Sequence, residues 1–378
     1  MTELRGRLAL GGALVPGRVT FEGERIAAVD VLPELAGEDA LPVIAPGFID
    51  LHVHGFGGCD PLQDLAGMAA ALAAAGTTAF QPTLFPGDPE RLGAQCAALW
   101  SRAAALRSGA RVLGIHCEGP FVNPAAAGAL PVSDLAIPSV AALRAILGPA
   151  TGDAHGVRTM TIAPELPGAL ELVEELARCG VRPSLGHSRA RAADARDAER
   201  AGASGVTHLY NAMTGHHHRE AGLVSAALVS DLCFAELIGD LVHVGPEAIE
   251  VALAARGPGG LALVSDALQG AGTGCDHFHS HGRDHVLVDG AAYYPAAEGC
   301  APKLAGSACS QLEMVRRLTA AGVLSLAEAL TMATETPARA LGLETELGVL
   351  APGAAADVIV LTGNSLQLSE VWLRGRCA

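Results

Sequence analysis

Pro46-Gly-Phe-Ile-Asp-Leu-His52-Val-His54 is the stretch that decides the fold of this chain. Its length and apolar content are typical of a buried strand. Side chains alternate along a strand, so His52 and His54 share one face while Val53 points away. Two imidazoles on one face of a barrel strand can chelate a metal ion. On an edge strand the same two histidines would simply face solvent. The position of the strand in the fold therefore decides which interpretation applies.

Seven further β-like apolar runs follow this stretch, and helical segments separate most of them. Eight βα units predict an α/β protein built as a (β/α)8 TIM-like barrel, with the histidine pair at the end of its first strand. The eight predicted strands span 48–54, 77–85, 111–118, 157–164, 181–187, 205–211, 233–243 and 261–266. The clearest predicted helices span 65–75, 89–107, 170–179, 189–201 and 246–256.

Both ends of the chain differ from this repeat. Residues 4–31 and 346–376 read as short strands separated by glycine-rich turns. We expect 1–45 and 346–378 to form a small β-sandwich accessory domain and 46–345 to form the barrel. Two insertions, 122–137 and 269–303, follow the third and eighth strands, and the second contains a predicted hairpin with an Asp289-Gly290 turn. Such loops lie where a barrel carries its chemistry.

Composition excludes several classes of partner. The net charge of −15 argues against nucleic acid or an anionic membrane surface, because phosphates are bound through Lys and Arg footprints. We find neither a signal-type apolar segment nor a run of about 18 apolar residues, so we expect a soluble cytoplasmic protein. Nine cysteines without a CxxC pair make a disulfide framework or a four-thiolate zinc site improbable.

Metal-ligating residue types recur where other predicted strands end. Glu118, His187 and His208 each occupy such a position, and with His52 and His54 they would converge on one barrel mouth. Imidazoles plus one carboxylate suit a divalent ion, with zinc favoured and iron, cobalt or manganese also compatible. His116 alternates with Glu118, so it is either a further ligand or a supporting histidine behind the ligands.

The eighth predicted strand ends in Asp266, a carboxylate on the same rim. A group there can take a proton from metal-bound water and return it to a leaving amine. The alternative role is a cap for the next helix. Lys303 is the only lysine and follows the eighth strand, so a carbamylated lysine on the fourth strand cannot bridge two metals. If two ions bind, Glu118 must bridge them.

Six motifs, in this order, resemble the N-acetylglucosamine-6-phosphate deacetylases of the amidohydrolase superfamily over nearly the whole chain. They are PGFIDLHVHG (46–55), HCEGPF (116–121), LGHS (185–188), THLYNAM (207–213), SDAL (265–268) and LAGSA (304–308). The resemblance implies that Glu118, His187 and His208 hold the core metal and that His52 and His54 form a further metal position. It makes Asp266 the general base and then the general acid.

The resemblance also implies a phosphosugar substrate and a homodimer. Arg219 and His243 would hold the phosphate, and Arg219 would come from the neighbouring subunit, although the histidine tract before it could equally be a solvated loop. A guanidinium offers phosphate a bidentate fork. The complete implied substrate set is Ala129, Asn211, Ala212, Arg219, His243, Leu304, Ala305, Gly306 and Ser307.

Two features depart from the family pattern. Leu130 stands where family members usually have a histidine, and the segment 275–285 is unusually rich in histidine. The first departure keeps open another amide hydrolase on the same barrel, such as a D-amino-acid deacylase or a dipeptidase. A non-catalytic sugar-phosphate sensor is a third interpretation, although such proteins tend to lose the ligand and base positions that this chain keeps.

Overall fold

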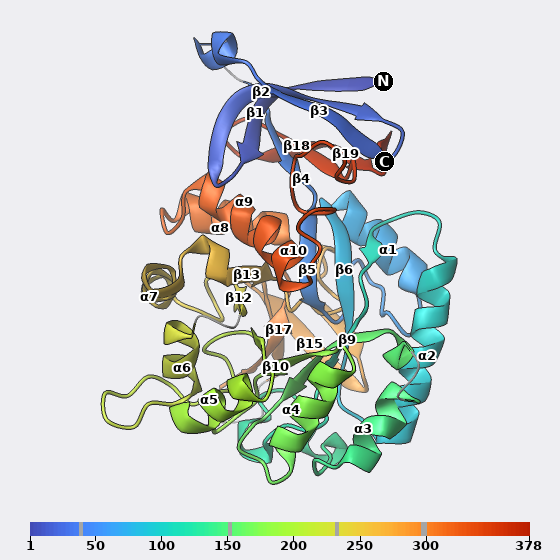
Figure 1. The fold of residues 1–378 in the computed structure, drawn as a ribbon, viewed down its shortest axis with the longest axis vertical. Helices are drawn as coiled ribbons and strands as arrows, with labels where there is room; N and C mark the ends of the chain where they lie inside the picture. Colours follow the sequence, from blue (N-terminus) through green and yellow to red (C-terminus); the bar gives the residue numbers. More distant parts are fainter. Residues whose placement is uncertain (38–40, 150–152, 231–233, 296–300) are drawn as a thin grey trace.

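A parallel barrel forms the centre of the computed structural model, which describes residues 1–37, 41–149, 153–230, 234–295 and 301–378 (Figure 1). Neighbouring strands pair in chain order, and the short β7 (Arg111–Val112) also pairs with β6. The barrel strands are β5 (Phe48–Val53), β6 (Thr77–Leu84), β8 (Ile115–Glu118), β9 (Val157–Ile162), β10 (Arg182–Leu185), β11 (Gly205–Val206), β12 (Phe234–Ile238) and β13 (Leu261–Val264).

Backbone contacts just beyond β13 close the ring against β5. The Asp266 amide donates to the carbonyl of His52 at 2.8 Å, and the His54 amide donates to the carbonyl of Ala267 at 2.9 Å. Val53 and Ala267 form a parallel bridge. The predicted eight-stranded barrel is confirmed, and its closure brings the histidine pair beside Asp266.

Helices surround the barrel (Figure 1). Capping fixes several of their starts, as where the Asp64 side chain accepts from the Gly67 amide. Among the helices that the predicted set did not include is the short α3, which begins after Ser139, a residue that also caps through its side chain. The helices are α1 (Leu65–Ala74), α2 (Pro89–Ala105), α3 (Val140–Leu147), α4 (Ala169–Arg178), α5 (Ala192–Arg200), α6 (Leu223–Val229), α7 (Pro246–Arg256), α8 (Gln311–Ala320), α9 (Leu326–Ala333) and α10 (Glu335–Ala340).

The two ends of the chain meet in one seven-stranded sheet, and both termini lie there (Figure 1). β4 joins the halves, because it pairs in parallel with β1 and antiparallel with β18. A separate apolar cluster that includes Leu8, Phe21 and Val358 fills this part of the molecule. The strand order is β20 (Arg376–Cys377), β19 (Gln367–Leu373), β18 (Val358–Thr362), β4 (Val43–Pro46), β1 (Thr2–Leu10), β2 (Ala13–Glu22) and β3 (Arg25–Val31).

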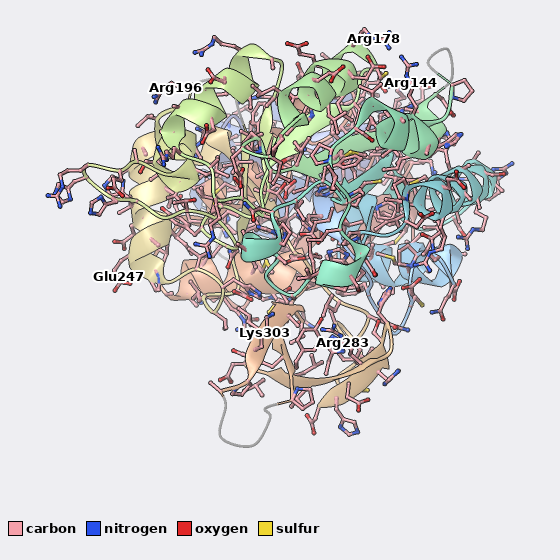
Figure 2. All side chains as sticks on the ribbon, turned by 90° about the horizontal axis from the view of Figure 1, so that it is seen from below. Arg144, Arg178, Arg196, Glu247, Arg283 and Lys303 are labelled. Carbon is pink, nitrogen blue, oxygen red and sulfur yellow. The ribbon has the colours of Figure 1, made fainter. Side chains whose placement is uncertain are left out.

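A four-stranded antiparallel sheet is inserted after the eighth barrel strand. It comprises β14 (His277–Ser280), β15 (Arg283–Val288), β16 (Ala291–Tyr294) and β17 (Lys303–Ser307). The predicted hairpin is present as β15 and β16. Figure 2 shows this sheet at one edge of the molecule, with Arg283 and Lys303 labelled. The Leu268 amide donates to the carbonyl of Ser307 and so joins the sheet to the barrel rim. We call it the lid sheet.

Helix length and apolarity do not support a membrane span anywhere in the described part of the chain.

Candidate active site

Three predicted metal ligands meet where β8, β10 and β11 end. The Nε2 atoms of His187 and His208 each lie 3.0 Å from Glu118 Oε1 and 3.0 Å from one another. All three residues are buried. His187 and His208 have φ angles of 46° and 29°, a left-handed conformation that costs free energy in a non-glycine residue. The turns after these strands therefore hold strained backbone that aims both rings inward.

The histidine pair of β5 forms a second group beside the first. His52 Nε2 and His54 Nε2 lie 3.2 Å apart, so both rings face the same side as alternation predicts. Glu118 lies between the groups, with Oε1 at 3.5 Å from His52 and Oε2 at 3.3 Å from His54. All five residues predicted as metal ligands are thus brought together from four strands.

The donor set fits a divalent cation. Neutral imidazole nitrogens and a carboxylate converge, and facing ring nitrogens at these separations can share a cation. Burial holds the pKa of His52 well below its usual value, which keeps that ring neutral and able to ligate. Burial alone would raise the pKa of Glu118, but His187, His208 and His52 outweigh it and hold that pKa well below its usual value.

Asp266 reaches the same cluster from the eighth strand. Its Oδ1 lies 3.4 Å from His52 Nε2 and 3.5 Å from His54 Nε2. Burial, followed by the charge of Glu118, raises its pKa well above the usual value. The residues directly after Asp266 lead into the lid sheet and form no helix, so the alternative role of helix cap is not seen.

Of the two alternatives for His116, the structure favours the supporting role. Its Nε2 lies 2.8 Å from Thr161 Oγ1 and its Nδ1 lies 3.3 Å from the carbonyl of Leu51, so both ring nitrogens have protein partners. The ring packs edge-on against His52, with centroids 4.6 Å apart. Burial lowers the pKa of His116 to about 3, so the ring is neutral where it packs against His52.

Sequence analysis missed two buried carboxylates behind the histidine pair. Glu236 Oε2 lies 3.0 Å from His52 Nδ1 and 3.4 Å from the backbone nitrogen of His208, so it contacts one ligand of each group. Asp50 Oδ1 accepts from the His52 and Ser265 amides, and burial raises the pKa of Asp50 to about 7. The available signal was an acidic residue inside an apolar run, as in Phe-Ala-Glu-Leu-Ile at 234–238.

A cavity of about 170 Å³ opens onto the cluster, and we call it the metal chamber. Most predicted substrate residues line it. His243 is oriented there by Asp240, whose Oδ2 lies 2.6 Å from His243 Nδ1. Leu130 also lines the chamber and packs with Val122 and Ala127, so it presents an apolar surface. The predicted substrate residues in its wall are Ala129, Asn211, Ala212, His243, Leu304, Ala305 and Gly306.

Two predicted substrate residues lie elsewhere. Ser307 is fully buried and its hydroxyl donates to the carbonyl of Ser265 at 2.6 Å, which holds the lid sheet to the barrel. Arg219 is exposed on the loop that leads into α6, and its Nη1 lies 2.7 Å from His218 Nε2. This loop extends away from the barrel (Figure 1). Within a single chain Arg219 therefore does not reach the chamber, whereas the other predicted phosphate ligand, His243, lines it.

Comparison with known proteins gives a consistent picture. A family model described as "Amidohydrolase family" matches residues 43–377. The chain is 36% identical to human N-acetylglucosamine-6-phosphate deacetylase, over 97% of this chain and 89% of the relative. It is 34% identical to an N-acetylgalactosamine-6-phosphate deacetylase of Escherichia coli O157:H7, over 93% and 92%. A solved N-acetyl-D-glucosamine-6-phosphate deacetylase from Mycobacterium smegmatis superimposes with a TM-score of 0.88 at 30% identity, covering all of both chains.

Proposed function

The chain belongs to the amidohydrolase family, and we propose that it hydrolyses N-acetyl-D-glucosamine 6-phosphate to D-glucosamine 6-phosphate and acetate. The observation that carries this proposal is the convergence of five candidate ligands and Asp266 at one chamber, whose wall includes all of them except His52. Relatives that keep this length and fold bear the same activity in their names. A purely binding homologue would not need a complete ligand set beside a proton carrier.

Glu118, His187 and His208 would hold one divalent ion, and His52 and His54 would hold a second with Glu118 shared between them. When bound, such an ion lowers the pKa of water and polarises a carbonyl oxygen. We propose zinc, because imidazole and carboxylate donors suit it.

Asp266 performs the proton transfers in this proposal. Its carboxylate takes a proton from the attacking water and delivers it to the amide nitrogen as the C–N bond breaks. The water oxygen forms the new bond to the acyl carbon, and acetate and the amine leave. The position of Asp266 within 3.5 Å of both β5 histidines supports this role.

Phosphate recognition would require two copies of the chain. Asn211 and His243 line the chamber, but Arg219 is exposed and lies outside it. In a homodimer the projecting loop of one subunit would reach the chamber of the other and supply a guanidinium for the phosphate. A phosphorylated sugar is too polar to cross a bilayer, so we place the enzyme in the cytoplasm, in amino-sugar catabolism.

Activity on matched substrates tests the proposal. N-acetylglucosamine 6-phosphate should exceed its unphosphorylated form in kcat/KM by about tenfold or more, because the unphosphorylated sugar forfeits the charge-assisted contacts. N-acetylgalactosamine 6-phosphate belongs in the same assay, because one relative is named for that substrate. Faster hydrolysis of N-acyl-D-amino acids or dipeptides would contradict the proposal, as would equal rates with and without phosphate.

A further inference from the structure

A second cavity of about 310 Å³ lies beside the metal chamber, and we call it the side chamber. It is larger than the metal chamber and shares part of its wall. The common residues are His54, Phe85, Ala129 and Ala305. Phe85 stacks on the His54 ring with centroids 3.9 Å apart, so the boundary between the two chambers includes a predicted metal ligand.

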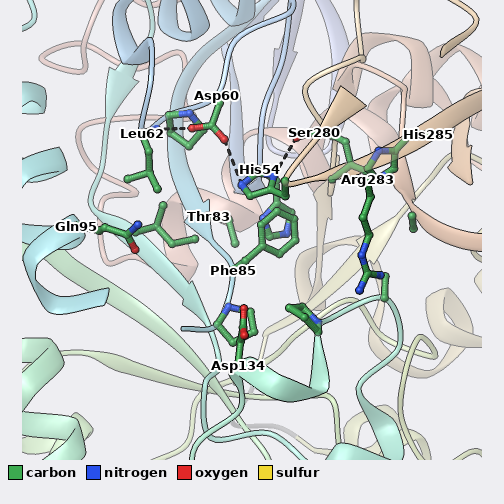
Figure 3. Close-up of a pocket in the computed structure, with 18 of the residues that line it drawn as sticks. His54, Asp60, Leu62, Thr83, Phe85, Gln95, Asp134, Ser280, Arg283 and His285 are labelled. Atoms are coloured by element: carbon green, nitrogen blue, oxygen red, sulfur yellow. Dashed lines mark hydrogen bonds and ion pairs between the residues drawn. The ribbon is translucent and has the colours of Figure 1, made fainter. Parts of the chain in front are cut away.

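The walls of the side chamber come from the loop after β5, the end of β6, helix α2, the loop after β8 and the lid sheet. Figure 3 shows Phe85 at its centre, with Asp60, Leu62 and Gln95 on one side and Ser280, Arg283 and His285 on the other. Apolar surface from Leu62, Leu84 and Leu268 is thus combined with polar groups. The three leucines offer an apolar surface to a bound group, and charged residues such as Asp60, Arg91 and Arg283 line other parts of the wall.

Buried polar atoms in this wall lack partners. Neither His54 Nδ1 nor His285 Nδ1 has a hydrogen-bond partner among the described residues, and each residue is only 4% exposed. Buried nitrogens without partners are costly and rare in folded proteins. They leave hydrogen-bonding capacity beside the chamber, which a bound group or the water around it can use.

The two chambers suggest how an amide would be oriented. Of the residues proposed to hold the phosphosugar, Ala129 and Ala305 line both chambers. The others in the wall, Asn211, Ala212, His243, Leu304 and Gly306, line the metal chamber alone. A sugar on that side places the amide nitrogen toward those residues. The acyl carbon then faces the opposite side, where His54 and Phe85 open onto the side chamber.

We propose that the side chamber receives the acyl group, so that the enzyme also hydrolyses amino-sugar phosphates whose N-acyl chains are longer than acetyl. This inference rests on the proposed function and names its acyl specificity. An acetyl methyl group fills only a small part of 310 Å³, whereas this volume leaves room for a linear four-carbon chain, which would point past Phe85 toward Leu62 and Gln95. The chemistry is unchanged, because one water is consumed, the same C–N bond breaks and a longer carboxylate leaves.

The test compares N-butanoyl-glucosamine 6-phosphate with the N-acetyl substrate. Wild-type kcat/KM for the butanoyl substrate should lie within tenfold of that for the acetyl substrate. Gln95→Trp fills the side chamber from α2 and should lower butanoyl hydrolysis by tenfold or more, with acetyl hydrolysis changed less than twofold. Ala94→Trp is the matched control, since Ala94 is exposed on the same helix and does not line the chamber.

A binding measurement adds a readout that does not depend on turnover. In the Asp266→Asn background, calorimetric Kd values for the two substrates should agree within tenfold, and adding Gln95→Trp should weaken only butanoyl binding. Normal acetyl hydrolysis with butanoyl hydrolysis more than tenfold slower would overturn this inference alone. Equal loss on both substrates in Gln95→Trp would also overturn it. If the acetyl substrate is not hydrolysed at all, the proposed function itself fails.

Discussion

The metal chamber and the loop that carries Arg219 were both predicted from sequence to bind substrate or metal, yet they differ in how the chain positions them. The five candidate ligands are at most 4% exposed, and each lies within 3.5 Å of another. The histidine tract and arginine of the loop are exposed and contact mainly one another. Figure 2 shows a nitrogen-rich projecting loop at the edge of the molecule farthest from α2.

This difference separates the residues that the fold of one chain positions from those that it leaves exposed. Backbone pairing fixes where the barrel strands end, so ligands on or just after β5, β8, β10 and β11 meet within one chain. An exposed loop fixes its side chains only when something packs against it. The metal cluster is therefore positioned by the fold of one chain, whereas the proposed phosphate contact of Arg219 would depend on a second copy of the chain.

The largest expected effect lies in the metal chamber. Asp266→Asn keeps the shape of the side chain but cannot carry a proton, so kcat should fall by about 10² to 10⁴. Metal content, measured by elemental analysis, should stay at the wild-type level. Near-normal turnover in this variant would remove Asp266 from its assigned role.

The next prediction concerns Glu236, which contacts the predicted metal ligand His52. Glu236→Gln removes the charge that faces His52 Nδ1 at 3.0 Å, and metal affinity should fall by about 10- to 100-fold. Competition with a chelator measures the change. Glu250→Gln, on the exposed face of α7, is the control and should bind metal normally. Unchanged affinity in both variants would show that Glu236 does not position the ligand.

A smaller effect is expected at the loop. Arg219→Ala should raise KM for the phosphorylated substrate by about tenfold, the loss expected for a charge-assisted hydrogen bond, and leave the unphosphorylated sugar unaffected. Arg196→Ala, at an exposed position on α5, is the control. An equal change in KM for both substrates would mean that Arg219 does not bind the phosphate group.

The smallest effect is recovery in mixed dimers. A dimer of one Arg219→Ala subunit and one Asp266→Asn subunit contains one intact site if the loop acts across the interface. Co-expressed subunits with different tags should therefore regain about half the wild-type activity per dimer. Failure to recover activity, or a strict monomer in light scattering, would contradict the assembly and leave the metal chamber account intact.

The sequence alone predicted side-chain positions that follow from strand alternation and from the order of the barrel strands. Alternation predicted that His52 and His54 share a face, and the strand ends predicted that Glu118, His187 and His208 would meet them. The sequence was not sufficient where position depends on distant packing. In the sequence, Glu236 is an isolated acidic residue in an apolar run, and only the fold brings it to His52. The side chamber is likewise not visible in the sequence, because residues of α2 and of the lid sheet line it together.

Anomalous diffraction from crystals grown with zinc and soaked with glucosamine 6-phosphate tests the central claim most directly. We predict a peak bounded by Glu118, His187 and His208, with any second peak at His52 and His54, and the amine of the product beside Asp266. A metal peak only on the histidine-rich strand β14, or product bound away from the metal chamber, would contradict the account.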